Sequence, residues 1–144
     1  MAPAERSELA TWLSPTQLAL FESMHPADRR HGLDVVASLR AAGVTSHDAL
    51  LAGLVHDAGK GRTGVWPRVA YALGDHYGRW IWRVAALVPG FRRGLERLRT
   101  HAEISAGLAA AAGCPPLTVE LIRHQDAALD PDFGELLRLA DEAN

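Results

Sequence analysis

The stretch that decides the fold is LLAGLVHDAGKG, residues 50–61. It begins with six apolar residues, a run that is typical of a helix enclosed in a protein core. His56 and Asp57 follow directly, before the helix-breaking sequence GKG. Burial of an imidazole and a carboxylate costs free energy unless these groups are paired or bind a metal. We therefore expect partners for His56 and Asp57 elsewhere in the chain.

Length and composition indicate one globular domain over residues 1–144. A chain of 144 residues, 48% hydrophobic and 22% charged, can bury one substantial core. The single Cys114 excludes an internal disulfide and permits a reducing compartment. The N-terminus lacks the apolar segment of a secretory signal, and the most apolar later stretch, 80–91, is shorter than the roughly 20 residues of a spanning helix. We expect a cytoplasmic protein.

Helical periodicity dominates the chain, and no run alternates apolar and polar residues as a half-buried strand does. Ser14 before Pro15 is a start signal, and Gly43 and Gly113 are stop signals. The sequence therefore predicts an all-α bundle of about seven helices. Their predicted spans are 17–24, 27–43, 47–59, 65–88, 100–113, 117–127 and 132–143.

Ionisable side chains from several predicted helices share faces with core residues. For example, His31 heads the apolar stripe of Val35 and Leu39, and Asp141 lies four residues after Leu137. A lone histidine on such a face usually bonds a carbonyl group, but a set of imidazoles and carboxylates is best explained by one or two divalent metal ions. A mixed set suits iron, manganese, zinc, cobalt or nickel better than calcium. The candidate ligands are His31, His56, Asp57, His101, His124 and Asp141.

Lys60 lies near the end of the same predicted helix as His56 and Asp57. Successive helical residues are about 100° apart, so His56 and Asp57 can reach one ion, or Asp57 can bridge two. Lys60 follows His56 by four residues and shares its face. Two interpretations stay open: Lys60 only ends the helix near Gly59, where a cation is favourable, or it also binds a phosphate.

Together these residues resemble the pattern of the HD-domain superfamily of metal-dependent phosphohydrolases. The stretch DRRHGLDV supplies the first histidine, LVHDAGKG the His-Asp doublet and LLRLADEAN the last aspartate. The resemblance covers the chain from residue 26 to its end. It implies that His31, His56, Asp57 and Asp141 ligate a metal ion and that Lys60 contacts a substrate phosphate.

Two further histidines resemble those of the HD-GYP subgroup, which would hold a second ion. They are His101 in HAEISAGL and His124 in LIRHQD. Where the subgroup has two adjacent histidines followed by Glu, this chain has His124, Gln125 and Asp126, and no Gly-Tyr-Pro follows. This departure counts against hydrolysis of a cyclic dinucleotide and leaves the second site incomplete.

The resemblance implies hydrolysis of a phosphomonoester or phosphodiester, on a small phosphorylated, nucleotide-like substrate. The metal would lower the pKa of a water that attacks phosphorus, and Asp57 would orient that water. Lys60 and Arg62 would neutralise charge on the phosphoryl oxygens. The alternative is a non-catalytic HD fold whose metal site serves sensing or partner binding.

The segment 64–100 is basic and aromatic, and is expected to be largely helical. It holds seven Arg against Asp75 and Glu96, a net charge of +5 in a chain of net charge -2. Three interpretations stay open: a lid that steers an anionic substrate, a surface that makes weak contact with anionic lipid, or core aromatics with a solvated basic face. Overall charge and the lack of a recognition motif argue against nucleic acid, and no pattern indicates the oligomeric state. The aromatic side chains are Trp66, Tyr71, Tyr77, Trp80 and Trp82.

Overall fold

The computed structural model describes residues 3–60 and 101–144, and the regular structure in these two ranges is entirely helical. The all-α prediction is confirmed. The first helix was not predicted from the sequence, whereas the predicted helix 65–88 lies outside the described residues. The elements are α1 (Pro3–Leu9), α2 (Pro15–Ser23), α3 (Pro26–Ala41), α4 (His47–Val55), the 3-10 turn η1 (Ala58–Lys60), α8 (His101–Ala111), α9 (Pro116–Arg123) and α10 (Gly134–Glu142).

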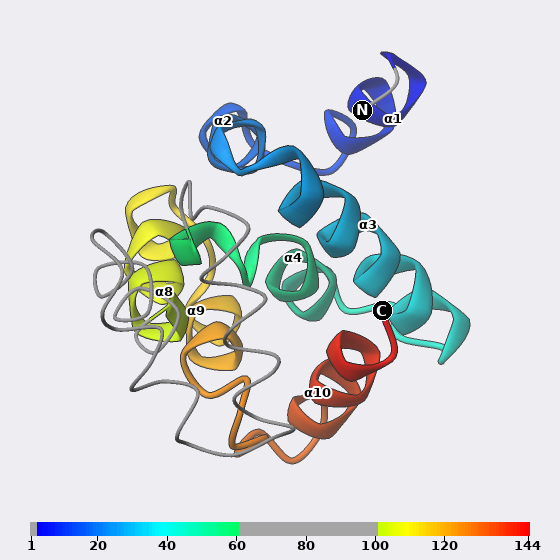
Figure 1. Ribbon diagram of the computed structural model, residues 1–144, viewed down its shortest axis with the longest axis vertical. Coiled ribbons are helices and arrows are strands. Elements are labelled where there is room, and N and C mark those ends of the chain that lie inside the picture. Colours follow the sequence, from blue (N-terminus) through cyan, green and yellow to red (C-terminus); the bar gives the residue numbers. More distant parts are fainter. Residues whose placement is uncertain (1–2, 61–100) are drawn as a thin grey trace, which may run out of the picture.

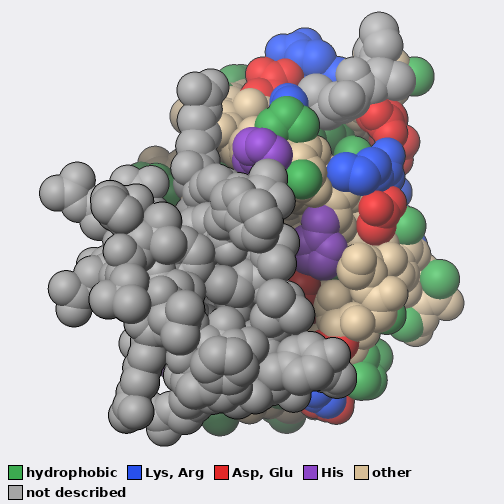
Figure 2. Space-filling view, in the orientation of Figure 1, with side chains coloured by type: hydrophobic (Ala, Val, Ile, Leu, Met, Phe, Trp, Pro, Cys, Tyr) green, Lys and Arg blue, Asp and Glu red, His purple; other side chains and the backbone are tan. Residues whose placement is uncertain are grey.

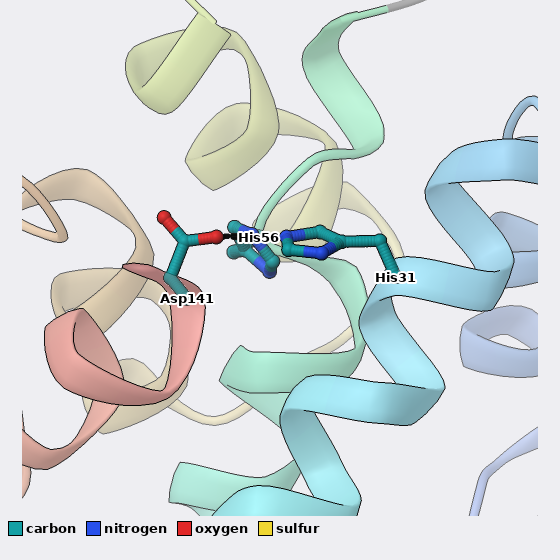
Figure 3. A group of neighbouring side chains, drawn as sticks. All are labelled: His31, His56 and Asp141. Atoms are coloured by element: carbon teal, nitrogen blue, oxygen red, sulfur yellow. Dashed lines mark hydrogen bonds and ion pairs between the residues drawn. The ribbon is translucent and has the colours of Figure 1, made fainter. Parts of the chain in front are cut away.

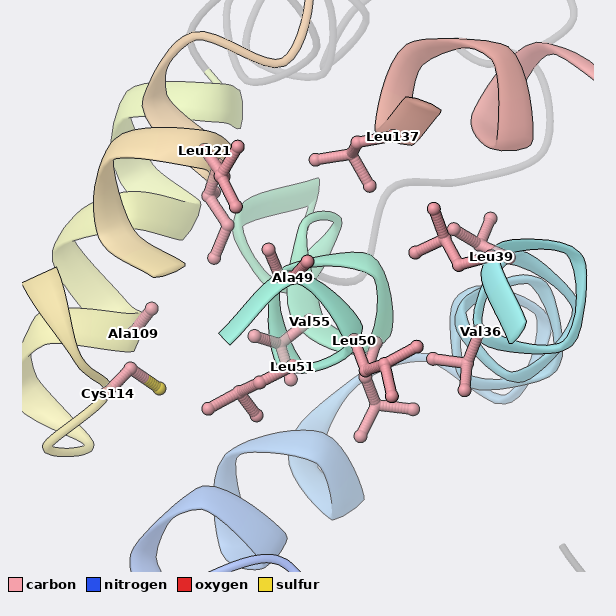
Figure 4. Close-up of a cluster of buried hydrophobic side chains, with 14 of the residues drawn as sticks. Val36, Leu39, Ala49, Leu50, Leu51, Val55, Ala109, Cys114, Leu121 and Leu137 are labelled. Atoms are coloured by element: carbon pink, nitrogen blue, oxygen red, sulfur yellow. The ribbon is translucent and has the colours of Figure 1, made fainter. Parts of the chain in front are cut away.

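Helix α4 is the centre of the bundle. Its residues from Ala49 to Val55 are all buried, as expected of a helix that is apolar on every side. Figure 1 shows α3 and α10 on one side of α4 and α8 and α9 on the other, with α2 across one edge. The leucines of α4 and Val55 pack between Leu39 of α3, Leu121 of α9 and Leu137 of α10 (Figure 4). The end of α4 therefore lies where helices from both ends of the chain meet.

Local signals set several helix limits as the sequence predicts. The Ser14 hydroxyl accepts a hydrogen bond from the Gln17 N–H at 3.2 Å, and the Gln17 side chain accepts one from the Ser14 N–H at 2.9 Å. These two bonds form a capping box. Gly43 and Gly113 follow helix ends with φ of 87° and 75°, in the left-handed region that glycine adopts without strain.

The prediction that one helix runs from 47 to 59 is wrong at its end. Helix α4 ends at Val55, and the chain then turns through His56 and Asp57 into η1. The reason is packing against α8. The Gly59 N–H donates to the buried hydroxyl of Ser105 at 2.8 Å, and a β-carbon on Gly59 would lie 2.5 Å from the carbonyl oxygen of His101. This contact holds the turn after α4 against the start of α8.

A second close approach joins α3 to α4. A β-carbon on Gly32 would lie 2.4 Å from the carbonyl oxygen of Leu54, so only glycine allows the two backbones to come this near. Because His31 precedes Gly32 and His56 follows Leu54 by two residues, this contact brings the two imidazoles together.

The surface of the described residues carries mixed charges. Figure 2 shows basic and acidic side chains next to one another on one face. Ion pairs such as Arg30 with Glu5 at 2.9 Å and Arg40 with Glu8 at 3.1 Å join α3 to α1. Within residues 3–60 and 101–144, no helix has the length and apolarity needed to cross a membrane.

Candidate metal centre

Three side chains from distant parts of the chain converge at the end of α4 (Figure 3). They are His31 from α3, His56 after α4 and Asp141 from α10. The Asp141 Oδ1 atom lies 2.7 Å from His31 Nε2 and 3.1 Å from His56 Nε2. Ligands of one first-row transition ion, each about 2.1 Å from it, lie about 3 Å apart. The spacing of these three atoms therefore suits a single ion.

The hydrogen bonds of His56 determine which of its nitrogens carries a proton. Its Nδ1 lies 2.9 Å from the carbonyl oxygen of Gly53, which can only accept, so Nδ1 is the donor. In the neutral ring, Nε2 then has a lone pair. That lone pair faces Asp141 Oδ1 at 3.1 Å and Asp57 Oδ1 at 3.5 Å. Three electron-rich atoms at these distances repel one another unless a proton or a cation lies between them.

Asp57 brings a second unsatisfied group to the same place. Its side chain is only 2% exposed, and its Oδ1 atom has no hydrogen-bond partner among the described residues. Its Oδ2 atom accepts from Lys60 Nζ at 2.6 Å and lies 3.9 Å from His31 Nε2. A buried carboxylate oxygen without a donor costs free energy. A cation beside Oδ1 would remove that cost, so the residues present fit a metal ion.

The electrostatics of the group favour positive charge. Burial acts against the charged form of His56, but the carboxylates of Asp57 and Asp141 outweigh it and raise the pKa of the imidazole. Burial likewise acts against ionised Asp57, but His56 and Lys60 outweigh it and lower the pKa of that carboxyl. Burial is also outweighed at Asp141, where hydrogen bonds from His31 and His56 hold the pKa far below its usual value. Two ionised carboxylates and two imidazoles form a ligand set of the type that binds iron, manganese, zinc, cobalt or nickel.

Lys60 lies at the edge of this group. Its ammonium bonds Asp57 Oδ2, and its side chain is 24% exposed. Lys60 therefore both closes the η1 turn and contacts the candidate ligand set. Arg62 and the basic aromatic segment 64–100, which were predicted to contribute to substrate or lipid contacts, lie outside the described residues.

The two further histidines take different places. His101 Nε2 lies 3.9 Å from Asp57 Oδ1 and 2.7 Å from the amide nitrogen of Gln125. His124 was expected on the buried face of its helix, but its side chain is 40% exposed and lies 3.4 Å from Glu120. Within the described part of the chain, the compact group of metal-type ligands includes neither histidine.

His124 lies at the end of α9, one turn after Glu120. Its N–H still donates to the Glu120 carbonyl, as in an α-helix, so its side chain lies on the same side of α9 as the exposed Glu120 and lines a surface cavity of about 220 Å³ beside the start of α10. Gln125 turns inward in its place and is buried. The sequence had marked Gln125 only as a departure from the HD-GYP pattern. It contained no local signal for the Ser105 contact with Gly59, which depends on how α8 packs.

Comparisons with known proteins do not extend this description. No family model matches the chain, and neither a curated protein nor a solved structure matches it. The resemblance to the HD-domain superfamily therefore stays a prediction from the sequence pattern around His31, His56, Asp57 and Asp141, and the candidate metal centre rests on the geometry of these residues.

Proposed function

We propose that this chain is a metal-dependent phosphohydrolase of the HD-domain type, which cleaves a phosphomonoester or phosphodiester of a small, nucleotide-like molecule. One observation carries the proposal. The Nε2 atom of His56 lies 3.1 and 3.5 Å from oxygens of two carboxylates, Asp141 and Asp57. A divalent cation is the ligand that satisfies all three atoms together.

The residues that would hold the ion are His31, His56, Asp57 and Asp141. When bound, the ion supplies positive charge that lowers the pKa of water and neutralises phosphoryl oxygens. The Gly53 carbonyl keeps the proton of His56 on Nδ1, which leaves Nε2 as a ligand atom and orients the ring.

Lys60 is the group that would meet the substrate phosphate. Its ammonium has three N–H donors. One of them donates to Asp57 Oδ2 at 2.6 Å. With two carboxylates, one ammonium and one divalent ion, the site would have a net positive charge and would attract an anionic substrate. Lys60 also keeps Asp57 ionised, because its charge lowers the pKa of that carboxyl.

The test combines metal content with phosphate release. We expect the purified chain to bind a divalent ion and, with added manganese, to hydrolyse one or more members of a panel of nucleotides. Phosphate release is measured directly for nucleoside monophosphates. For cyclic nucleotides, an added phosphatase releases phosphate from the monophosphate product. Asp57→Asn keeps the shape of the side chain but replaces the anionic carboxylate with a neutral amide. This variant should lose both metal and turnover. Asp34→Asn is the matched control, because Asp34 is exposed and pairs with Arg30 on the surface of α3; it should keep both.

The outcomes separate the proposal from its rival. Unchanged metal content in Asp57→Asn would show that the ion binds elsewhere. Metal binding by the wild-type chain without turnover of any substrate, under any divalent ion, would favour the alternative of a non-catalytic HD module for sensing or partner binding.

A further inference from the structure

We propose that Gln125 limits this centre to one metal ion, by holding the Nε2 atom of His101 in a hydrogen bond. The inference rests on the metal-binding function proposed above and goes beyond it, because it assigns the number of ions to one residue. Its starting point is one hydrogen bond: Gln125 is buried, only 5% exposed, and its amide nitrogen lies 2.7 Å from Nε2 of the partly buried His101.

Without Gln125, His101 and Asp57 would be placed to share an ion. The two atoms that face one another, His101 Nε2 and Asp57 Oδ1, are 3.9 Å apart. Two ligands that are each about 2.1 Å from one ion lie at most about 4.2 Å apart. Asp57 Oδ1 also has no hydrogen-bond partner among the described residues, so it could accept a second cation as well as the first.

The amide of Gln125 prevents this in either of its orientations. With the NH2 group against the ring, as in the structure, an N–H donates to the Nε2 lone pair. With the amide rotated by 180°, the carbonyl oxygen would face the ring, and Nε2 would have to carry a proton to donate to it. In both cases the lone pair that a metal ion needs is not available.

The amide oxygen of Gln125 is the second polar atom to consider beside His101. Oε1 is buried and has no hydrogen-bond partner among the described residues. A neutral amide oxygen is a weak ligand for the iron-to-zinc group compared with a carboxylate. Gln125→Glu keeps the size of the side chain and replaces the amide with an anionic ligand beside His101 Nε2, which itself lies 3.9 Å from Asp57 Oδ1. This variant should complete a second site.

The experiment counts ions. Manganese per chain is measured by elemental analysis after dialysis, by calorimetric titration and by electron paramagnetic resonance, which detects coupling between two neighbouring Mn²⁺ ions. We expect one ion in the wild-type chain, two coupled ions in Gln125→Glu, and a second, weaker ion in Gln125→Ala, which removes the amide from His101 Nε2. Adding His101→Ala to Gln125→Glu should return the count to one.

His124→Ala is the matched control, because His124 is the adjacent residue but its side chain is 40% exposed and pairs with Glu120; its count should stay at one. Two ions in the wild-type chain would overturn the inference and leave the proposed function intact, whereas no ion would contradict the proposed function itself. A count of one in Gln125→Ala and in Gln125→Glu, with wild-type helix content by circular dichroism, would show that another group sets the number. If Gln125→Glu does not fold, Gln125→Ala decides the question alone.

Discussion

At the scale of single residues, the site is defined by which atoms have partners and which do not. His56 uses one nitrogen on the Gly53 carbonyl and directs the other at two carboxylates. Asp57 uses one oxygen on Lys60 and leaves the other buried and unpaired. His56 Nε2 and Asp57 Oδ1 lie 3.5 Å apart, beside Asp141 Oδ1, so a cation bound there would interact with all three atoms.

One residue outside the ligand set holds this arrangement in place. The Ser105 side chain is buried and accepts from the Gly59 N–H. Ser105→Ala should lower the free energy of unfolding by about 1–3 kcal/mol, because it leaves a buried N–H without an acceptor. Urea unfolding measures the change. Ser23→Ala is the control: its hydroxyl is exposed and bonds the Leu20 carbonyl, so a change below about 0.5 kcal/mol is expected. Equal losses in the two variants would contradict this role of Ser105.

At the scale of elements, the site depends on close contacts between backbones. Helix α3 meets α4 at Gly32, and η1 meets α8 at Gly59. Neither glycine has the positive φ of a turn glycine; each is needed because its neighbour leaves no room for a β-carbon. These contacts set the distance between His31 and His56, and between Asp57 and His101.

Gly32→Ala tests the contact between α3 and α4. The added methyl group would lie 2.4 Å from the Leu54 carbonyl oxygen, so the helices must separate at a cost of about 1–3 kcal/mol. The variant should also bind metal more weakly, because His31 moves away from His56. Gly107→Ala is the control, since it is in α8 with nothing within 4 Å of an added β-carbon; it should stabilise the chain by about 0.5–1 kcal/mol. Urea unfolding and metal titration check both. A Gly32→Ala variant with wild-type stability would show that the contact is not tight in solution.

At the scale of the whole molecule, the centre ties the two ends of the described chain together. His31 and Asp141 are 110 residues apart in sequence, and His56 joins them from the central helix. Because these candidate ligands come together only in the folded chain, we expect metal binding to be linked to folding.

Metal addition should therefore raise the melting temperature of the wild-type chain. At a free metal concentration 100 times the Kd, the expected gain in stability is about 2.7 kcal/mol, and a chelator should reverse it. Differential scanning calorimetry with and without manganese gives the shift. Asp141→Asn should abolish most of the shift, whereas Glu135→Gln, an exposed change in the same helix that pairs with Arg138, should retain it. An equal shift in both variants would place the ion outside the centre.

Much of the fold was predictable because it depends on neighbours in sequence. The capping box at Ser14, the stop signals at Gly43 and Gly113, and the apolar run in α4 are interactions within one or two helical turns. The limit of α4 was not predictable in this way, since α4 gives way to η1 through a contact with Ser105, 46 residues from Gly59.

The sequence by itself therefore determined an all-helical chain, most of its helix limits, and the presence of imidazoles and carboxylates on faces that must be buried. Only the tertiary structure decided which of these atoms meet: His31, His56, Asp57 and Asp141 come together, while His124 stays outside. The physical reason is that helical periodicity places a side chain on one side of its helix but does not decide which other helix packs there. Beyond the end of α9, packing turned Gln125 inward in place of its neighbour.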